Sequence, residues 1–211
     1  MADPPRHAGP VPPEPPLADE ALVLRPPRDA DAGAIAAACA DPEIARWIPV
    51  PIPYAPADAR AFLEGVADGW SSGDDLTFAI EERPEGAAGM LVGMIGLHRG
   101  SAPGHASVGY WLAPHARGRG LATRAVRLLV AWAFEDPRLE RLELMTMVGN
   151  HASGRVALRA GFRREGILRR FLPFRGRHVD AVMYAVVRGD VPADRPAGTT
   201  RPAVDGPGRG P

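Results

Sequence analysis

The alternation of apolar and polar residues in the first half of the chain predicts strands, interrupted by two stretches with helical periodicity. Three successive apolar runs are separated by short turns rich in Gly and Pro, and consecutive strands with such short connections form an antiparallel meander. The expected strands lie at 21–25, 76–81, 90–97 and 107–112, and the expected helices run through Cys39 and over 56–69.

The second half begins with an amphipathic helix. Its apolar residues Leu121, Ala125, Leu128, Leu129 and Trp132 recur at the spacing of one helix face, which we expect to pack on the sheet. A strand at 141–148, a short helix at 152–160 and two strands at 163–171 and 179–187 follow. The whole pattern predicts an α/β (α+β) fold with a mixed, mostly antiparallel central sheet of about six to seven strands, flanked by about four helices.

Composition places this fold in the middle of the chain. The 211 residues are 45% hydrophobic and 24% charged, which is ordinary for one globular domain. Half of the 24 prolines lie in residues 1–20 and 189–211, where large apolar residues are few. Such segments bury too little surface to offset their ordering entropy, so we expect two disordered tails around a domain at 21–188.

Charge and hydropathy limit the partners that we expect. The net charge is zero, so no overall field attracts nucleic acid or an anionic membrane. The longest apolar runs are far shorter than a membrane span, and the N-terminal region lacks a signal-peptide apolar core. We therefore expect a cytoplasmic protein, monomer or homodimer, with no nucleic acid or membrane partner. The lone Cys39 fits a small buried core residue better than a nucleophile.

The segment Arg117-Gly118-Arg119-Gly120-Leu121-Ala122 joins a strand to the amphipathic helix. Its glycines permit positive φ angles and close approach, so successive N–H groups can converge on an anion at the helix N-terminus. A P-loop is excluded because the chain has no lysine, and the dinucleotide-binding pattern would need glycine where Thr123 stands. A flexible turn beside two solvated arginines stays open as the alternative.

Several motifs together resemble one enzyme family. Arg117-x-x-Gly120-x-Ala122 matches the Q/R-x-x-G-x-G/A signature of the GNAT acyl-CoA N-acyltransferases, and 109–112 reads Gly-Tyr-Trp-Leu. Asn150-x-x-Ser153 and the later block at 161–184 are similar to the Rim-type branch, which acetylates the N-termini of ribosomal proteins. The resemblance covers residues 21–188.

The resemblance implies acetyl-CoA as cosubstrate, a primary amine as acceptor, and a sheet that splays where the cofactor arm inserts. It implies Ser153 as general acid toward the thiolate and Asn150 as a contact to the cofactor. The implied cofactor-binding residues are Trp111, Leu112, Arg117, Gly118, Arg119, Gly120, Leu121, Ala122, Asn150 and Ser153. Residues expected on the acceptor side are Trp47, Ser107 and Tyr110.

The residues that handle the acceptor's proton depart from the family pattern. Many members carry a glutamate where this chain has Ser107 and a tyrosine where it has Ala157, and some carry an acidic residue near the position of Leu172. His98 is the catalytic candidate for the base, because its ordinary pKa suits proton relay. A water chain leading to Glu81, Glu82 or Asp180 remains equally open.

Two functions stay open on this sequence. The first is an N-acetyltransferase acting on a protein α-amine or a small-molecule amine, without a metal, since the spacing of the histidines matches no ligand pattern. The second is a catalytically silent protein that binds acyl-CoA as a sensor or interaction module, which the missing glutamate and tyrosine motivate.

Overall fold

The computed structural model describes residues 12–83, 88–100 and 102–190. Most of the two expected tails, residues 1–11 and 191–211, lies outside this described part. The strands are β1 (Leu17–Ala18), β2 (Leu22–Arg25), β3 (Asp75–Glu82), β4 (Met90–Arg99), β5 (His105–Leu112), β6 (Arg141–Met147), β7 (Arg163–Phe174) and β8 (Arg177–Val187). The α-helices are α1 (Ala32–Cys39), α2 (Pro42–Trp47), α3 (Pro56–Ser72), α4 (Leu121–Ala133) and α5 (His151–Arg159).

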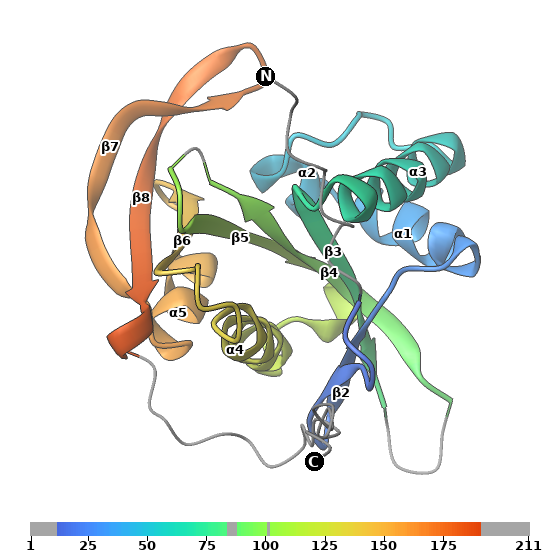
Figure 1. Ribbon diagram of the computed structural model, residues 1–211. Coiled ribbons are helices and arrows are strands. Elements are labelled where there is room, and N and C mark those ends of the chain that lie inside the picture. The colour runs from blue at the N-terminus through green and yellow to red at the C-terminus, as the bar shows by residue number, and fades with distance from the viewer. Residues whose placement is uncertain (1–11, 84–87, 101, 191–211) are drawn as a thin grey trace, which may run out of the picture.

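All the strands of the described chain belong to one sheet, in the order β1-β2-β3-β4-β5-β6-β8-β7. β5 and β6 are parallel, and the other neighbouring strands pair antiparallel. Helices α1, α2 and α3 lie on one side of this sheet and α4 and α5 on the other, while the long β7–β8 hairpin curves away at one edge (Figure 1). The expected mixed, mostly antiparallel α/β fold is confirmed.

Two elements correct the sequence prediction. The described sheet has eight strands rather than six or seven, because Leu17 and Ala18 pair with β2. Order therefore begins before residue 21, where we placed the domain boundary, and a two-residue strand shows no alternation that could have revealed it. The fifth helix, α2, is only six residues long and starts at Pro42, a residue that is acceptable in a first helical turn.

The core has two parts, one on each face of the sheet. Phe78, Ile80 and Leu129 belong to the larger cluster on the side of α4 and α5, and each is fully buried. Ile35 and Cys39 belong to the smaller cluster on the side of α1 and α3, so the expectation that Cys39 is a buried core residue is confirmed. Both faces of the central strands are thus covered, which fixes the sheet as a rigid support.

The predicted apolar face of α4 packs as expected. Leu121, Ala125 and Leu129 are buried, and Leu128 and Trp132 are partly buried against the same cluster. This packing orients the helix axis, and with it the N-terminus that follows the glycine loop. In the described ranges, no helix combines the length and the apolar composition that a membrane crossing requires.

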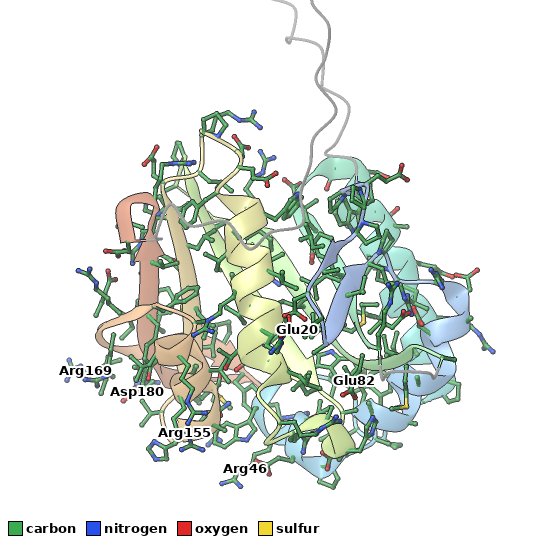
Figure 2. All side chains as sticks on the ribbon, turned by 90° about the horizontal axis from the view of Figure 1, so that it is seen from below. Glu20, Arg46, Glu82, Arg155, Arg169 and Asp180 are labelled. Carbon is green, nitrogen blue, oxygen red and sulfur yellow. The ribbon has the colours of Figure 1, made fainter. Side chains whose placement is uncertain are left out.

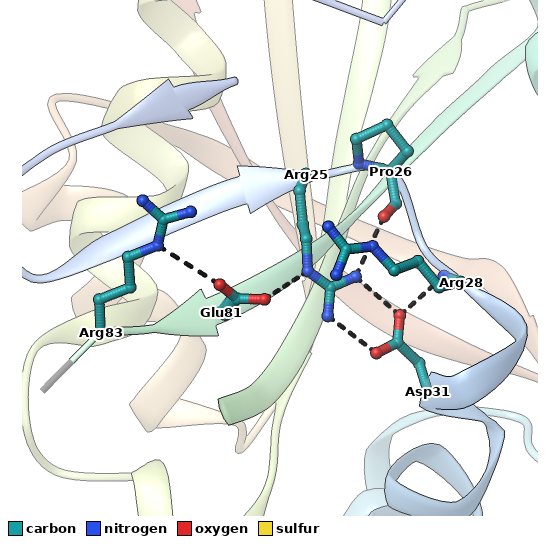
Figure 3. A network of polar contacts seen from close by, with 6 residues as sticks. All are labelled: Arg25, Pro26, Arg28, Asp31, Glu81 and Arg83. Atoms are coloured by element: carbon teal, nitrogen blue, oxygen red, sulfur yellow. Dashed lines mark hydrogen bonds and ion pairs between the residues drawn. The ribbon is translucent and has the colours of Figure 1, made fainter. Parts of the chain in front are cut away.

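A buried arginine ties strand β2 to its surroundings (Figure 3). Arg25 of β2 donates two hydrogen bonds of 2.8 Å to the carboxylate of Asp31 and one of 2.5 Å to Glu81 of β3. Arg25 and Asp31 are 6% and 7% exposed, so both charges are removed from water and compensated within the network. The network fixes β2 against β3 and against the start of α1.

Candidate active site

The sheet opens between β5 and β6. Their parallel pairing ends at Ser107 and Glu143, although β5 continues to Leu112 and β6 to Met147. Beyond that point the strands diverge, and the edge of β5 offers main-chain groups to a partner other than β6. This is the splay that the family resemblance implied.

A cavity of about 520 Å³ lies at this opening. Its walls come from both faces of the sheet: Val156 belongs to α5, Ile44 and Phe62 belong to α2 and α3, and Leu172 reaches it from the β7–β8 hairpin. Among the predicted site residues, the lining contains Trp47, His98, Tyr110, Trp111, Leu112, Arg117, Gly118, Ala122, Asn150 and Ser153. The cavity therefore brings residues from both faces of the sheet to the opening.

The glycine loop adopts the conformation that its sequence predicts. Gly118 and Gly120 have φ angles of 74° and 81°, in the left-handed region that L side chains rarely adopt. Gly120 is the N-cap of α4. Glycine has no side chain that could accept a capping hydrogen bond, so the first helical N–H groups stay available. A helix of 13 residues adds its dipole at this end. The loop thus fits an anion such as a pyrophosphate.

Both arginines of this loop form ion pairs, whereas the sequence left open that they are only solvated. Arg117 Nη2 lies 2.5 Å from Asp41 Oδ2, and its Nε donates a hydrogen bond of 3.2 Å to the Leu112 carbonyl. Arg119 makes a two-pronged contact with Glu82, in which Nη1 donates to Oε2 at 2.9 Å. Figure 2 shows Glu82 beside the N-terminal end of α4. Neither arginine is simply solvated, and carboxylates offset part of the charge at the loop.

Ser153 lies in the first turn of α5 and contacts the neighbouring strand. Asn150 caps the helix, where its Oδ1 accepts a hydrogen bond of 3.1 Å from the Ser153 backbone N–H. The Tyr110 hydroxyl of β5 donates to Ser153 Oγ at 3.0 Å. Burial raises the pKa of Tyr110 to about 12, and the contact with Ser153 offsets only part of that shift. Tyr110 therefore keeps its proton near neutral pH.

Many members of the family that the sequence resembles carry a tyrosine at a position that falls on α5. In this chain a tyrosine of strand β5, Tyr110, contacts that helix. Ala157 fills the matching helical position and is fully buried. Tyr110, which we expect on the acceptor side from sequence, lines the cavity and extends its hydroxyl to Ser153. Spacing within the helix gave no sign of this arrangement, because the two residues are 43 positions apart and meet only through the fold.

His98 lies on the opposite face, and a carboxylate holds it. Its Nδ1 is 3.1 Å from Asp75 Oδ2, and Asp75 Oδ1 accepts a hydrogen bond of 2.7 Å from the Thr77 hydroxyl. Burial by itself would raise the pKa of Asp75, but the hydrogen bonds from His98 and Thr77 outweigh it and lower the pKa. Sequence reasoning missed Asp75 and Thr77, since neither belongs to a motif.

The other candidate proton acceptors are engaged elsewhere. Glu81 bonds to Arg25, Glu82 bonds to Arg119, and Asp180 Oδ1 accepts a hydrogen bond of 2.8 Å from the Arg170 backbone. The cavity lining contains His98 and none of these three carboxylates.

On the acceptor side, Trp47 donates its indole N–H to Glu43 Oε1 at 2.7 Å, and both side chains line the cavity. Four predicted site residues are outside the lining. Ser107 stands at the end of the β5–β6 pairing, and Leu121 is buried in the core. Arg119 and Gly120 belong to the outer part of the glycine loop.

Comparison with known proteins agrees with this geometry. Residues 21–163 match the family model described as the acetyltransferase (GNAT) domain. The chain is 40% identical over 101 residues to YdaF of Bacillus subtilis, whose name provisionally assigns it to ribosomal N-acetyltransferases; this match covers 47% of the chain and 55% of YdaF. It is 28% identical over 174 residues to the uncharacterized N-acetyltransferase YoaA of the same organism, covering 82% of the chain and 96% of YoaA.

A solved structure supports the same family assignment. Mycobacterium smegmatis RimJ in complex with CoA-disulfide superposes with a TM-score of 0.72 at 28% identity, over 81% of this chain and 84% of RimJ. The family model matches more than half of the chain, and the fold and the glycine loop fit the family. The chain therefore belongs to the GNAT acetyltransferase family, with Rim-type acetyltransferases among its homologues.

Proposed function

We propose that this protein is an N-acetyltransferase that moves the acetyl group of acetyl-CoA to a primary amine by direct attack in a ternary complex. The acceptor is a protein N-terminal α-amine or a small-molecule amine. The observation that carries the proposal is that one cavity at the splayed strands is lined by part of the glycine loop, by Ser153 and by His98.

The cofactor side supplies binding and orientation. Backbone N–H groups of residues 118–122 at the start of α4 would hold the pyrophosphate, because the two positive-φ glycines form the turn that leads into a helix N-terminus. The free edge of β5 at Trp111 and Leu112 would pair with the amides of the pantetheine arm. Bound in this way, the cofactor would have its thioester in the opening between β5 and β6.

The chemistry needs a proton donor for the departing thiolate. The amine nitrogen forms a bond to the thioester carbonyl carbon, and the carbon–sulfur bond breaks. A thiol of this kind has a pKa of roughly 8.5, so the leaving sulfur gains from a donated proton near neutral pH. Ser153 would donate from Oγ, and the Tyr110 hydroxyl would support it through the 3.0 Å hydrogen bond. His98 would accept the proton that the amine loses.

Thiol release from acetyl-CoA, measured over a panel of peptides and small amines, tests this proposal. We expect turnover on at least one acceptor, a large loss of kcat in Ser153→Ala, and a loss of cofactor binding in Gly120→Glu. Tight CoA binding without turnover on any amine would support the silent acyl-CoA sensor instead. No CoA binding at all would exclude both functions.

A further inference from the structure

His98 stands across the strand ladder from the position where this chain lacks the family glutamate. In the antiparallel register of β4 and β5, His98 pairs directly with Ser107. Paired residues of neighbouring strands point to the same face of a sheet. The imidazole is therefore one strand away from the missing carboxylate, on the face covered by α1 to α3.

Two glycines shape the place that the imidazole occupies. A Cβ atom at Gly96 would lie 3.0 Å from His98 Nε2, and one at Gly109 would lie 3.1 Å from the same atom. The ring thus lies against bare backbone of β4 and β5, where any larger residue would displace it. Because His98, Gly96 and Gly109 all line the cavity, Nε2 is held at the wall of the opening.

The other ring nitrogen has a fixed partner. Asp75 of β3 pairs with His98 in the β3–β4 register, and the two side chains approach to 3.1 Å at Nδ1 and Oδ2. Thr77 holds the second carboxylate oxygen of Asp75. A carboxylate facing Nδ1 favours the tautomer that carries its proton there, and this leaves a lone pair on Nε2.

We propose that Asp75 and Thr77 are positioning residues that hold His98 as the catalytic base for the amine. This inference rests on the proposed acetyltransferase function and assigns the two residues that would orient its base. The attacking amine gives one proton to Nε2 as its nitrogen bonds to the carbonyl carbon, and Asp75 stabilises the resulting imidazolium. The His98 side chain is 41% exposed, so the proton then passes to water.

Other charged groups near His98 have partners of their own. From α2, Glu43 lines the same cavity and accepts the Trp47 indole N–H. From β6, Glu143 stands opposite Ser107 and accepts a hydrogen bond of 2.8 Å from Arg141, with His105 Nδ1 3.8 Å away. From α3, Gly69 lies so close to Asp75 that an added Cβ would be 2.6 Å from the Asp75 carbonyl oxygen, and glycine brings no charge. Asp75 is thus the carboxylate placed to bind the ring.

Kinetics of variants at two adjacent aspartates, Asp75 and Asp74, test whether Asp75 positions His98. Asp75→Asn keeps the shape of the side chain but removes its charge, so we expect kcat to fall at least about 10-fold while KM for acetyl-CoA stays unchanged. The pH–rate profile of this variant should differ from that of the wild type, because the proposed base loses the carboxylate that holds it. Asp74→Asn is the matched control: that residue is exposed and pairs with Arg99, so its profile should equal the wild type. An unchanged kcat and profile in Asp75→Asn overturns the assignment.

Nitrogen NMR of the histidine side chains gives a readout that needs no acceptor. In 15N-labelled protein, with His98→Gln identifying the resonance, we expect neutral His98 to carry its proton on Nδ1, and this preference to be lost in Asp75→Asn. A neutral His98 protonated on Nε2 in the wild type overturns the inference even if the enzyme is active. Absence of turnover with the Nδ1 tautomer present would instead count against the proposed function, so the two failures are distinguishable.

Discussion

The Tyr110 hydroxyl donates a hydrogen bond of 3.0 Å to Ser153 Oγ, and this contact joins β5 to the first turn of α5. The bond links a strand at the opening with the helix that supplies the proposed acid. Since Asn150 fixes the backbone of the same serine, Ser153 is held from two directions. A hydroxyl that receives a hydrogen bond becomes a better donor, so the pair is suited to protonating a thiolate.

Tyr110→Phe removes this donor without emptying the space that the ring fills. We expect kcat to fall about 10-fold, with KM for acetyl-CoA unchanged, because general-acid support is lost while the cavity wall remains. The steady-state rate of thiol release measures this. Tyr54→Phe is the control, since that tyrosine packs against the smaller core cluster, outside the contact with Ser153. Equal kcat values for the Tyr110 variant and the wild type would show that the phenol has no part in the acid step.

Glu82 is expected to weaken cofactor binding in the native protein. It is 8% exposed and forms the two-pronged contact with Arg119, so its charge competes with phosphate for that guanidinium. In Glu82→Gln the arginine keeps a hydrogen-bond partner of the same shape but faces no anion. We expect acetyl-CoA to bind about 3- to 10-fold more tightly, a gain of about 1 kcal/mol, as measured by isothermal titration calorimetry.

Salt dependence separates this effect from a change in packing. If Arg119 gains a phosphate contact in Glu82→Gln, the affinity should fall more steeply with added salt than in the wild type, because exposed charge pairs are screened. Unchanged or weaker binding of acetyl-CoA by Glu82→Gln would mean that Arg119 anchors the loop to β3 and does not contact the cofactor.

Gly120→Ala tests the loop. The added Cβ would meet nothing within 4 Å, so its cost in the fold is the left-handed conformation alone, about 1–2 kcal/mol. We expect the loss of acetyl-CoA affinity to exceed that expected from destabilisation, because the methyl group occupies space that the pyrophosphate needs. Gly161→Ala is matched, with φ 97° and equally open surroundings at the end of α5. If both variants bind acetyl-CoA with similar affinity in calorimetry, the glycine loop is not part of the cofactor site.

The sequence predicted the parts of this protein that depend on local patterns. The apolar face of α4, the alternation in β6 and the glycine loop each follow from a few neighbouring residues, and the structure bears them out. Asn150 and Ser153 belong to a short motif at the start of α5, and the helix cap that Asn150 forms is also a local feature. Their roles at the site stay predictions.

Contacts between distant segments could not be predicted in this way. Tyr110 and Ser153 meet only because β5 and α5 are neighbours in the fold, and Asp75 meets His98 only through the register of β3 and β4. A single sequence contains no signal for either pairing, since tyrosine and aspartate are also ordinary in strands and turns. The elements β1 and α2 were missed because each is too short to establish a period.

The buried network around Arg25 predicts the stability of the fold in acid. Burial alone would raise the pKa of Asp31 and of Glu81, but hydrogen bonds from Arg25 outweigh it, so both carboxyl groups have lowered pKa values in the folded protein. A carboxyl group with a lowered folded pKa stabilises the fold above its unfolded pKa, about 4. That contribution disappears as the pH falls through the folded pKa. We therefore expect the free energy of unfolding to be insensitive to these two groups near neutral pH and to fall below about pH 4.5.

Arg25→Met separates this network from the other carboxylates. At pH 7 the variant removes the cation from the buried Asp31 and from the partly buried Glu81, and we expect it to lose about 3–5 kcal/mol in urea denaturation. In acid those carboxylates are neutral in both proteins, so the difference between variant and wild type should shrink toward pH 3. Arg138→Met removes the arginine of an exposed pair with Asp136 and should change stability little at any pH. A constant difference between Arg25→Met and wild type from pH 7 to pH 3 would mean that lost packing, rather than the charge network, causes the destabilisation.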